Sequence, residues 1–257
     1  MSKEAYEEIN MNSENLFEIF LNGISNIRGV AIDREEFLCS VFKKYRGAKY
    51  EGQEDDKEAP TVLQCIISVG PPQAGISKAD LDEIADKIIK RSRFMTTGVS
   101  FLAGMPGGLA MAATLPADVL QFYLQAFILL QKLMYLYGQW NEDFFDAVGD
   151  MSEDAKNVTI VYIGYMLGVE AATKVVGNIV AKATSKGFII RTLIKNSLGR
   201  GLAIKIVRAI GIKSSAKVVS AGSKAIPVVG AFVSGGVTYI SFGPMAKRLK
   251  SSLSKMI

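Results

Sequence analysis

Apolar residues recur at helical spacing in the first 45 residues of the chain. One run follows the potential N-cap Ser13, and a second follows Asp33, which forms a D-x-x-E capping pattern with Glu36. Apolar positions three and four residues apart share one face of an α-helix, so both runs predict amphipathic helices. Their apolar positions are Leu16, Phe17, Phe20, Leu21 and Ile24, and then Phe37, Leu38, Val41, Phe42 and Tyr45. Residues 46–60 are polar and aperiodic, which predicts a loop or linker.

Two further segments precede the most apolar part of the chain. Residues 61–70 read TVLQCIISVG, a run too short for periodicity to separate helix from strand, and we favour a helix. Ser77 is a candidate N-cap for the next helix, which carries acids in its first turn and bases in its last turn, as the helix dipole favours. Its predicted buried face comprises Leu81, Ile84, Ala85, Ile88 and Ile89.

Residues 94–137 contain the longest apolar stretches. The 24 residues 94–117 are uncharged, but Pro106, Pro116 and four glycines interrupt them, so a simple membrane-spanning helix is not expected. Residues 117–137 contain no helix breaker and lie between Pro116 and Gly138, which predicts a second, long helix.

Four polar residues form a single stripe about 60° wide on this long helix, and the rest of its circumference is apolar. They are Asp118, Gln121, Gln125 and Lys132. We favour a central helix of a soluble bundle with a thin exposed edge. The alternative is a helix covered by lipid or lining a cavity, in which Asp118 is a working charge rather than an N-terminal cap.

The second half of the chain continues the helical pattern. The acidic residues 141–156 lack the spacing of a calcium loop and predict a solvated face, and residues 158–169 predict a buried helix. Beyond residue 170, apolar helical segments alternate with glycines. Residues 225–246 form a second uncharged stretch that glycine and proline interrupt, and we attach no weight to the GxxxG matches at Gly104–Gly108 and Gly164–Gly168.

Composition indicates a folded protein whose membrane contact, if present, is local. The 257 residues are 49% hydrophobic and 21% charged, with a mean hydropathy of +0.23. The two cysteines, Cys39 and Cys65, and the acidic start favour a reduced, cytoplasmic protein without a signal peptide. Histidine is absent, which removes the commonest metal ligand and general base.

Charge is divided unequally along the chain. Residues 1–170 contain all 25 acids and 15 bases, a net charge of −10, whereas residues 171–257 contain 15 bases and no acid, a net charge of +15. Ordinary solvated surfaces mix both signs, so this basic region predicts an anionic partner.

Anionic lipid is the favoured partner of the basic region, and nucleic acid is less favoured. Eleven of the 15 bases are lysine, aromatic residues are few, and the same helices carry aliphatic faces. Alternatively, these helices pack in a bundle whose outer surface is merely basic. The candidate lipid contacts are Lys186, Arg191, Lys195, Arg200, Lys205, Arg208, Lys213, Lys217, Lys247, Arg248 and Lys250.

Three stretches together resemble the EcsC family of bacterial proteins. They are GISKADLDEIADKIIKRS, PGGLAMAATLPADVLQFYLQAFILLQKLMYLYG and AIPVVGAFVSGGVTYISFGPMAKR, and the resemblance covers roughly residues 60–250. The family's founding member is encoded beside ABC transporter subunits, so the resemblance implies a membrane-linked accessory role. It implies no catalytic mechanism and no catalytic residues.

Motifs of catalysis and cofactor binding are absent from the sequence. It contains no GxSxG elbow, no Walker GxxxxGK[ST], no GxGxxG and no cysteine pair at metal spacing, so we predict no catalytic residues, cofactor or metal. The enzymatic alternative is that Asp118 lies in an apolar pocket that raises the pKa of its carboxyl group, as in general acids.

We predict an all-α multi-helix bundle with glycine-rich apolar hairpins. It comprises an N-terminal extension and linker, residues 1–59, and an EcsC-like domain, residues 60–257. The predicted function is non-enzymatic: the protein acts on the bilayer or on a membrane complex, at the inner face of the cell membrane, as a transport accessory or membrane-perturbing effector. The alternative is a soluble bundle that binds a lipid-like ligand in an apolar cavity lined by the 117–137 helix.

Overall fold

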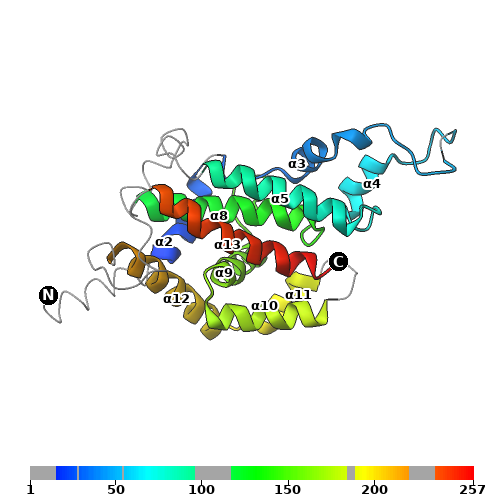
Figure 1. The fold of residues 1–257 in the computed structure, drawn as a ribbon. Coiled ribbons are helices and arrows are strands. Elements are labelled where there is room, and N and C mark those ends of the chain that lie inside the picture. The colour runs from blue at the N-terminus through cyan, green and yellow to red at the C-terminus, as the bar shows by residue number, and fades with distance from the viewer. Residues whose placement is uncertain (1–15, 28, 54, 96–116, 184–188, 220–234) are drawn as a thin grey trace, which may run out of the picture.

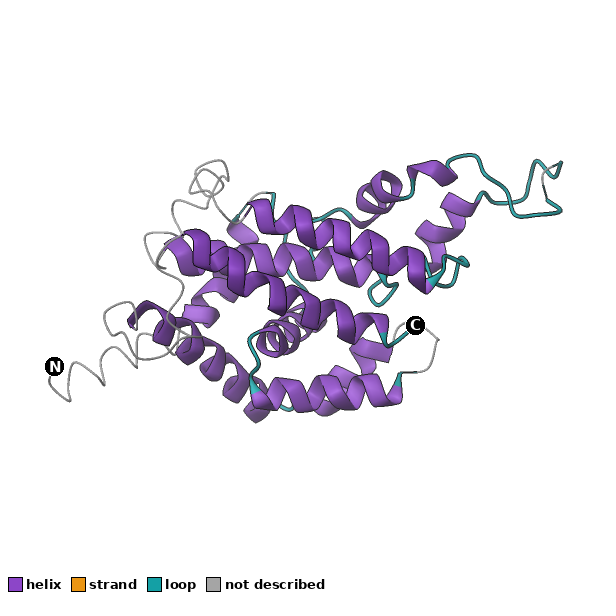
Figure 2. Ribbon diagram, viewed as in Figure 1, coloured by secondary structure: helices purple, strands orange, loops and turns teal. Residues whose placement is uncertain are grey.

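The part of the chain that the structure describes is mostly α-helical. This computed structural model describes residues 16–27, 29–53, 55–95, 117–183, 189–219 and 235–257. Over these ranges it contains ten α-helices, two short 3-10 helices and no β-strand, which confirms the predicted all-α bundle (Figure 2). The predicted glycine-rich hairpins fall largely on residues 96–116 and 220–234, outside the described residues.

The connections between the helices differ in length, and those over residues 46–61 and 137–152 are long (Figure 1). In chain order they are α2 (Leu16–Gly23), η1 (Ile24–Asn26), α3 (Arg34–Val41), η2 (Lys43–Tyr45), α4 (Val62–Val69), α5 (Lys78–Met95), α8 (Ala117–Leu136), α9 (Glu153–Met166), α10 (Glu170–Lys182), α11 (Ile189–Ser197), α12 (Arg200–Val219) and α13 (Gly235–Ser254).

Local sequence signals set several of these boundaries. The side chain of Asp33 accepts a hydrogen bond of 2.7 Å from the backbone N–H of Glu36, and Ser77 Oγ accepts one of 3.1 Å from Asp80, as the capping patterns predict. The favoured helix in residues 61–70 is confirmed as α4, which begins at a reciprocal Thr61–Gln64 capping box. The long helix after Pro116 is confirmed as α8, and Gly138 follows it at a φ of 62°.

Two apolar helices, α8 and α9, form the centre of the bundle. α8 packs against α3, α5, α9 and α13, while α9 packs against α8 and all four of α10 to α13. Between Val119 and Leu136, 94% of the α8 residues are buried. In Figure 1, α5 and α8 run alongside each other with α13 crossing beside them, and α10 and α12 flank the end of α9.

Gly164 lets α10 and α12 approach α9 closely. A Cβ atom on Gly164 would lie 2.8 Å from Cγ2 of Ile206 on α12 and 2.9 Å from Cβ of Ala172 on α10. A side chain here would therefore push both neighbours away. The GxxxG match at Gly164–Gly168, to which we attached no weight, therefore includes a glycine that helix packing requires. Gly168 follows α9 at a φ of 69°.

The described N-terminal helices share the core of the long domain. Phe17 and Phe20 of α2 pack on Tyr123 of α8, with ring centroids 5.1 and 5.0 Å apart. The fully buried Gln131 of α8 accepts a hydrogen bond of 3.0 Å from the backbone N–H of Ile32 and donates one of 2.9 Å to the carbonyl of Val30. Helices on both sides of the predicted boundary near residue 59 therefore contribute to one continuous hydrophobic core.

A partly buried group of polar side chains connects α5, α13 and the end of α8. The hydroxyl of Tyr137 donates a 2.6 Å hydrogen bond to Oδ1 of Asp82, and Ser254 Oγ donates one of 3.1 Å to Oδ2. Lys78 donates to the carbonyl of Ser254. Burial, together with the adjacent Asp82 carboxylate, raises the pKa of Tyr137, so its hydroxyl stays protonated and keeps donating.

Candidate functional site

The polar stripe predicted on α8 is not an exposed edge. Gln121 and Gln125 are both buried, so the expectation of a thin solvent-facing strip is wrong at these two positions. The reason is that neighbouring helices cover α8 on several sides, which the periodicity of α8 alone does not reveal. Lys132 is half-buried, and burial, with the nearby positive charge of Arg91, lowers its pKa. The side chain of Asp118 lies outside the described residues.

By length and composition alone, α8 could cross a membrane. α9 and α10 together pass the same test as one bent span, with 109° between them. A buried core helix also passes this test, and α8 is packed inside the bundle.

Three of the candidate lipid-contact residues are committed to contacts within the protein. Arg191 forms ion pairs with Glu142 and with Asp154, the latter at 3.3 Å, and its guanidinium lies 4.7 Å from the ring centroid of Trp140. Arg248 donates to the carbonyl of Tyr165 at 3.2 Å. Lys250 pairs with Asp86 at 2.8 Å.

Several of the remaining candidates are open to solvent. The exposed ones are Lys195, Arg200, Lys205, Arg208 and Lys247. Lys195, Arg200 and Lys205 form no hydrogen bond or ion pair with the described residues. Lys186 and the side chains of Lys213 and Lys217 lie outside the described residues.

α12 carries both charge and an apolar side chain on its exposed face. Arg200, Ile204 and Arg208 are spaced by four residues, which aligns them along one side of the helix, and Lys205 adjoins them. Ile204 is 55% exposed and places an aliphatic side chain among these bases. We call Arg200, Ile204, Lys205 and Arg208 the α12 ridge. Ile206 and Ile210, both fully buried, anchor the opposite side of α12 against Gly164 of α9.

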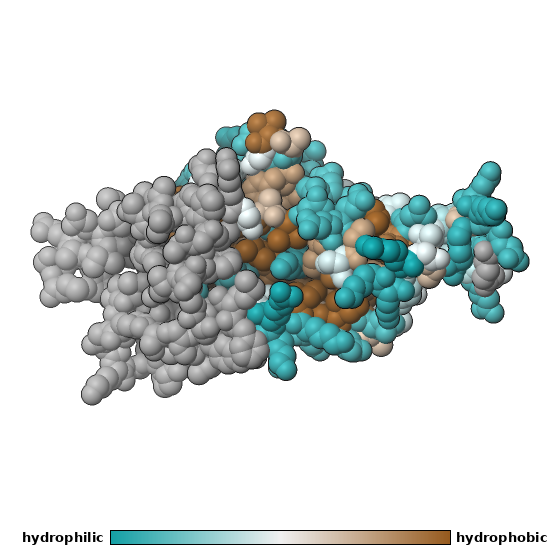
Figure 3. Space-filling model, turned by 90° about the horizontal axis from the view of Figure 1, so that it is seen from above, coloured by the Kyte–Doolittle hydropathy of each residue, from teal (hydrophilic) through white to brown (hydrophobic). Residues whose placement is uncertain are grey.

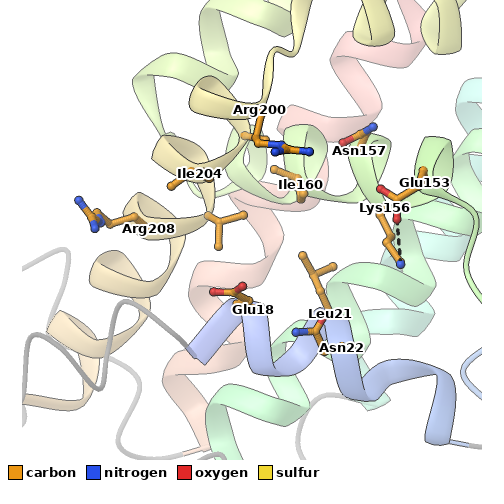
Figure 4. A pocket seen from close by; sticks show the side chains of 12 residues that line it. Glu18, Leu21, Asn22, Glu153, Lys156, Asn157, Ile160, Arg200, Ile204 and Arg208 are labelled. Carbon is orange, nitrogen blue, oxygen red and sulfur yellow. Dashed lines mark hydrogen bonds and ion pairs between the residues drawn. The ribbon is translucent and has the colours of Figure 1, made fainter.

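Beside the α12 ridge lies an open pocket of about 350 Å³ between α2, α9 and α12 (Figure 4). Sequence reasoning missed it, because its walls come from three segments far apart in the chain. Its lining combines charged, amide and aliphatic side chains: Glu18, Leu21, Asn22, Glu153, Lys156, Asn157, Ile160, Arg200, Ala203, Ile204, Val207 and Arg208.

The polar groups of this pocket are arranged at two ends. Figure 4 shows Arg200 directed between α12 and α9 near Asn157, whereas Glu18 and Asn22 lie on α2 at the opposite end. None of these four side chains forms a hydrogen bond with the described residues. Lys156 and Glu153 instead pair with each other at 3.1 Å. The pocket can therefore offer a cation with an amide at one end and a carboxylate with an amide at the other.

The described residues do not bring potential metal ligands together in a group. Among them, no group of three or more His, Cys, Asp or Glu side chains could hold a metal ion, and Cys39 and Cys65 are both free and half-buried. The surface seen from above α5 alternates hydrophilic residues with smaller hydrophobic areas (Figure 3).

Comparison with known proteins finds no family model, curated protein or solved structure that matches the chain. These comparisons neither support nor contradict the resemblance to the EcsC family.

Proposed function

We propose that this protein is a non-enzymatic accessory or effector that binds the anionic, cytoplasmic face of a bacterial membrane through its basic C-terminal third. It acts there on the bilayer or on a membrane complex. The α12 ridge carries the proposal, because it places two arginines and a lysine around an exposed isoleucine in a region without a single acid between residues 171 and 257.

Each part of the α12 ridge contributes to binding in a different way. A base close to an anionic membrane gains on the order of 1 kcal/mol, and the effect decays within about 8 Å at physiological ionic strength. Ile204 adds about 1 kcal/mol by leaving water for the interfacial region. Several such contributions hold a folded domain on the surface without inserting α8, whose apolar residues are already buried in the bundle.

The surface-bound form and the soluble lipid carrier differ in the residues that meet the lipid. The carrier would hold lipid in a cavity lined by the 117–137 helix, whereas the surface-bound form uses exposed side chains of α12 and leaves the buried α8 packed against its neighbouring helices. Nucleic acid remains the competing anionic partner, but the α12 ridge presents an aliphatic side chain rather than an aromatic one on which a base could stack. The EcsC resemblance agrees with a membrane-linked accessory role.

Vesicle sedimentation tests the proposal. We expect the protein to bind vesicles that contain phosphatidylglycerol, to bind pure phosphatidylcholine vesicles far less, and to dissociate as salt increases. Equal binding to both vesicles, or binding to neither, contradicts the proposal. Tight, salt-sensitive binding to DNA in place of lipid would assign the basic region to nucleic acid.

A charge-matched pair of variants locates the binding face. Lys195→Glu with Lys205→Glu reverses two exposed, unpaired bases in the basic third and should weaken binding to anionic vesicles at least about tenfold. Lys43→Glu with Lys57→Glu changes the net charge equally, from +5 to +1, but acts on exposed residues of the acidic half. This control should bind almost as well as the original protein. Equal losses in both variants would mean that net charge, and not the basic third, governs binding.

A further inference from the structure

We propose that the pocket between α2, α9 and α12 binds the headgroup of a phospholipid that carries both a phosphate and a primary amine. Arg200 and Asn157 contact the phosphate, and Glu18 and Asn22 contact the amine. This inference rests on the proposed membrane association and adds a lipid specificity to it.

The charge of the pocket favours a zwitterion over a purely anionic ligand. Lys156 and Glu153 neutralise each other at 3.1 Å, and Figure 4 shows Arg208 directed away from the pocket. Arg208 is a lining residue whose side chain extends outward, so the unpaired charges left to meet a ligand inside are Arg200 at one end and Glu18 at the other. A ligand with phosphate alone would leave Glu18 without a counter-charge, whereas one with phosphate and ammonium groups satisfies both ends.

The lining distinguishes a primary amine from a quaternary one. An ammonium group donates three hydrogen bonds, which the Glu18 carboxylate and the Asn22 amide oxygen, one helical turn apart on α2, can accept. A trimethylammonium group donates none and is usually held by aromatic side chains. The twelve lining residues include no aromatic residue.

The shape of the pocket is consistent with a headgroup whose acyl chains remain outside. Its volume of about 350 Å³ lies at the lower end of the range for small-molecule sites. Ile160, Leu21 and Val207 provide aliphatic contacts for the glycerol carbons. The exposed Ile204 lines the same pocket and belongs to the α12 ridge, so a lipid held there can keep its chains in the membrane that the ridge contacts.

Vesicles of equal charge test this specificity. We would compare two compositions with the same fraction of phosphatidylglycerol, the remainder being phosphatidylethanolamine in one and phosphatidylcholine in the other. The full-length protein should bind the ethanolamine vesicles about three- to tenfold more tightly, as expected for one charge-assisted hydrogen-bonded contact that is partly exposed to water. Equal affinity for the two compositions overturns the inference and leaves the proposed function standing.

Two substitutions on α2 separate recognition of the amine from general effects of lipid packing. Glu18→Gln, and independently Asn22→Ala, should remove the preference for ethanolamine while preserving binding to phosphatidylglycerol vesicles. Glu51→Gln is the matched control, because it removes the same charge from an exposed loop residue. If the preference survives in both α2 variants, it comes from the packing of the bilayer and the inference is wrong.

A soluble ligand tests the pocket without a membrane. Glycerophosphoethanolamine should compete with ethanolamine vesicles and perturb the NMR signal of Asn22 or Asn157, whereas glycerophosphocholine should do so much less. Competition by free glycine alone would assign the pocket to amino acids and overturn the inference. If no vesicle binds, the proposed function fails, and the response to glycerophosphoethanolamine then decides separately whether the pocket recognises the phosphate and amine.

Discussion

Gly164 and Gly177 lie on neighbouring helices but differ in whether a larger side chain would fit. A Cβ on Gly164 would lie under 3 Å from side-chain atoms of both Ile206 and Ala172, whereas a Cβ on Gly177 of α10 would meet no atom within 4 Å. Gly164→Ala should therefore destabilise the fold by about 1–3 kcal/mol, because α10 and α12 must move apart. Gly177→Ala should stabilise it by about 0.5–1 kcal/mol, since alanine loses less backbone entropy on forming a helix.

Urea unfolding of both variants measures this difference. The Gly177 variant is also the control, because it makes the same chemical change on an exposed helix surface. Equal effects of the two substitutions would show that Gly164 is not a contact point for α12. The sequence could not separate the two glycines, because the atoms that crowd Gly164 come from residues 172 and 206.

At the scale of single elements, α11 contacts the acidic part of the chain through Arg191. This arginine pairs with Glu142 and Asp154 and covers the ring of Trp140, while Ile190 and Ile194 supply buried apolar contacts. Arg191→Ala should lower stability by about 1–2 kcal/mol, the sum of a partly exposed ion pair and a cation–π contact. It should also shift the fluorescence emission of Trp140 to longer wavelength, because removing the guanidinium exposes the ring to water.

Trp140 is the only tryptophan in the chain, so all tryptophan emission comes from the ring that Arg191 covers. Lys195→Ala provides the control on the same helix, because Lys195 is exposed and has no described partner. It should leave both stability and emission nearly unchanged. An Arg191→Ala protein with the original emission and melting temperature would show that α11 does not depend on this contact.

The elements that the sequence predicted well are those with local signals. Asp33 and Ser77 each accept a hydrogen bond from a backbone N–H three residues further on, so their helix starts can be recognised from the neighbouring sequence. Thr61 makes the same contact at the start of α4, although we did not predict it as a cap. The burial of Gln121 and Gln125 could not be predicted in this way, because it depends on which distant helices cover α8. The same holds for Arg191, whose acidic partners precede it by 49 and 37 positions.

For the whole molecule, folding brings some acids of the first part of the chain next to bases of the last part, which partly offsets the unequal distribution of charge along the sequence. Asp86, Glu142 and Asp154 of the acidic half pair with Lys250 and Arg191 of the basic third. The basic region predicted from sequence is therefore smaller on the folded surface than in the chain, and the α12 ridge is its clearest described part. The candidate pocket beside the ridge depends on this assembly, since α2, α9 and α12 meet only in the folded protein.

A molecule that binds a membrane through one face should keep its core intact when it binds. We therefore expect amide hydrogen exchange in α8 to be slow in solution and unchanged on phosphatidylglycerol vesicles, because 94% of residues 119–136 are already buried. Exchange in α12 should slow on the vesicles, because the α12 ridge becomes covered, and high salt should reverse this protection together with binding. Helix α5 also carries exposed lysines but is not part of the proposed membrane-binding face, so its exchange rate should not change and serves as the internal reference. If α8 instead exchanges faster on vesicles and the protein resists carbonate extraction, the bundle opens and inserts its apolar helices, and surface binding through α12 is the wrong description.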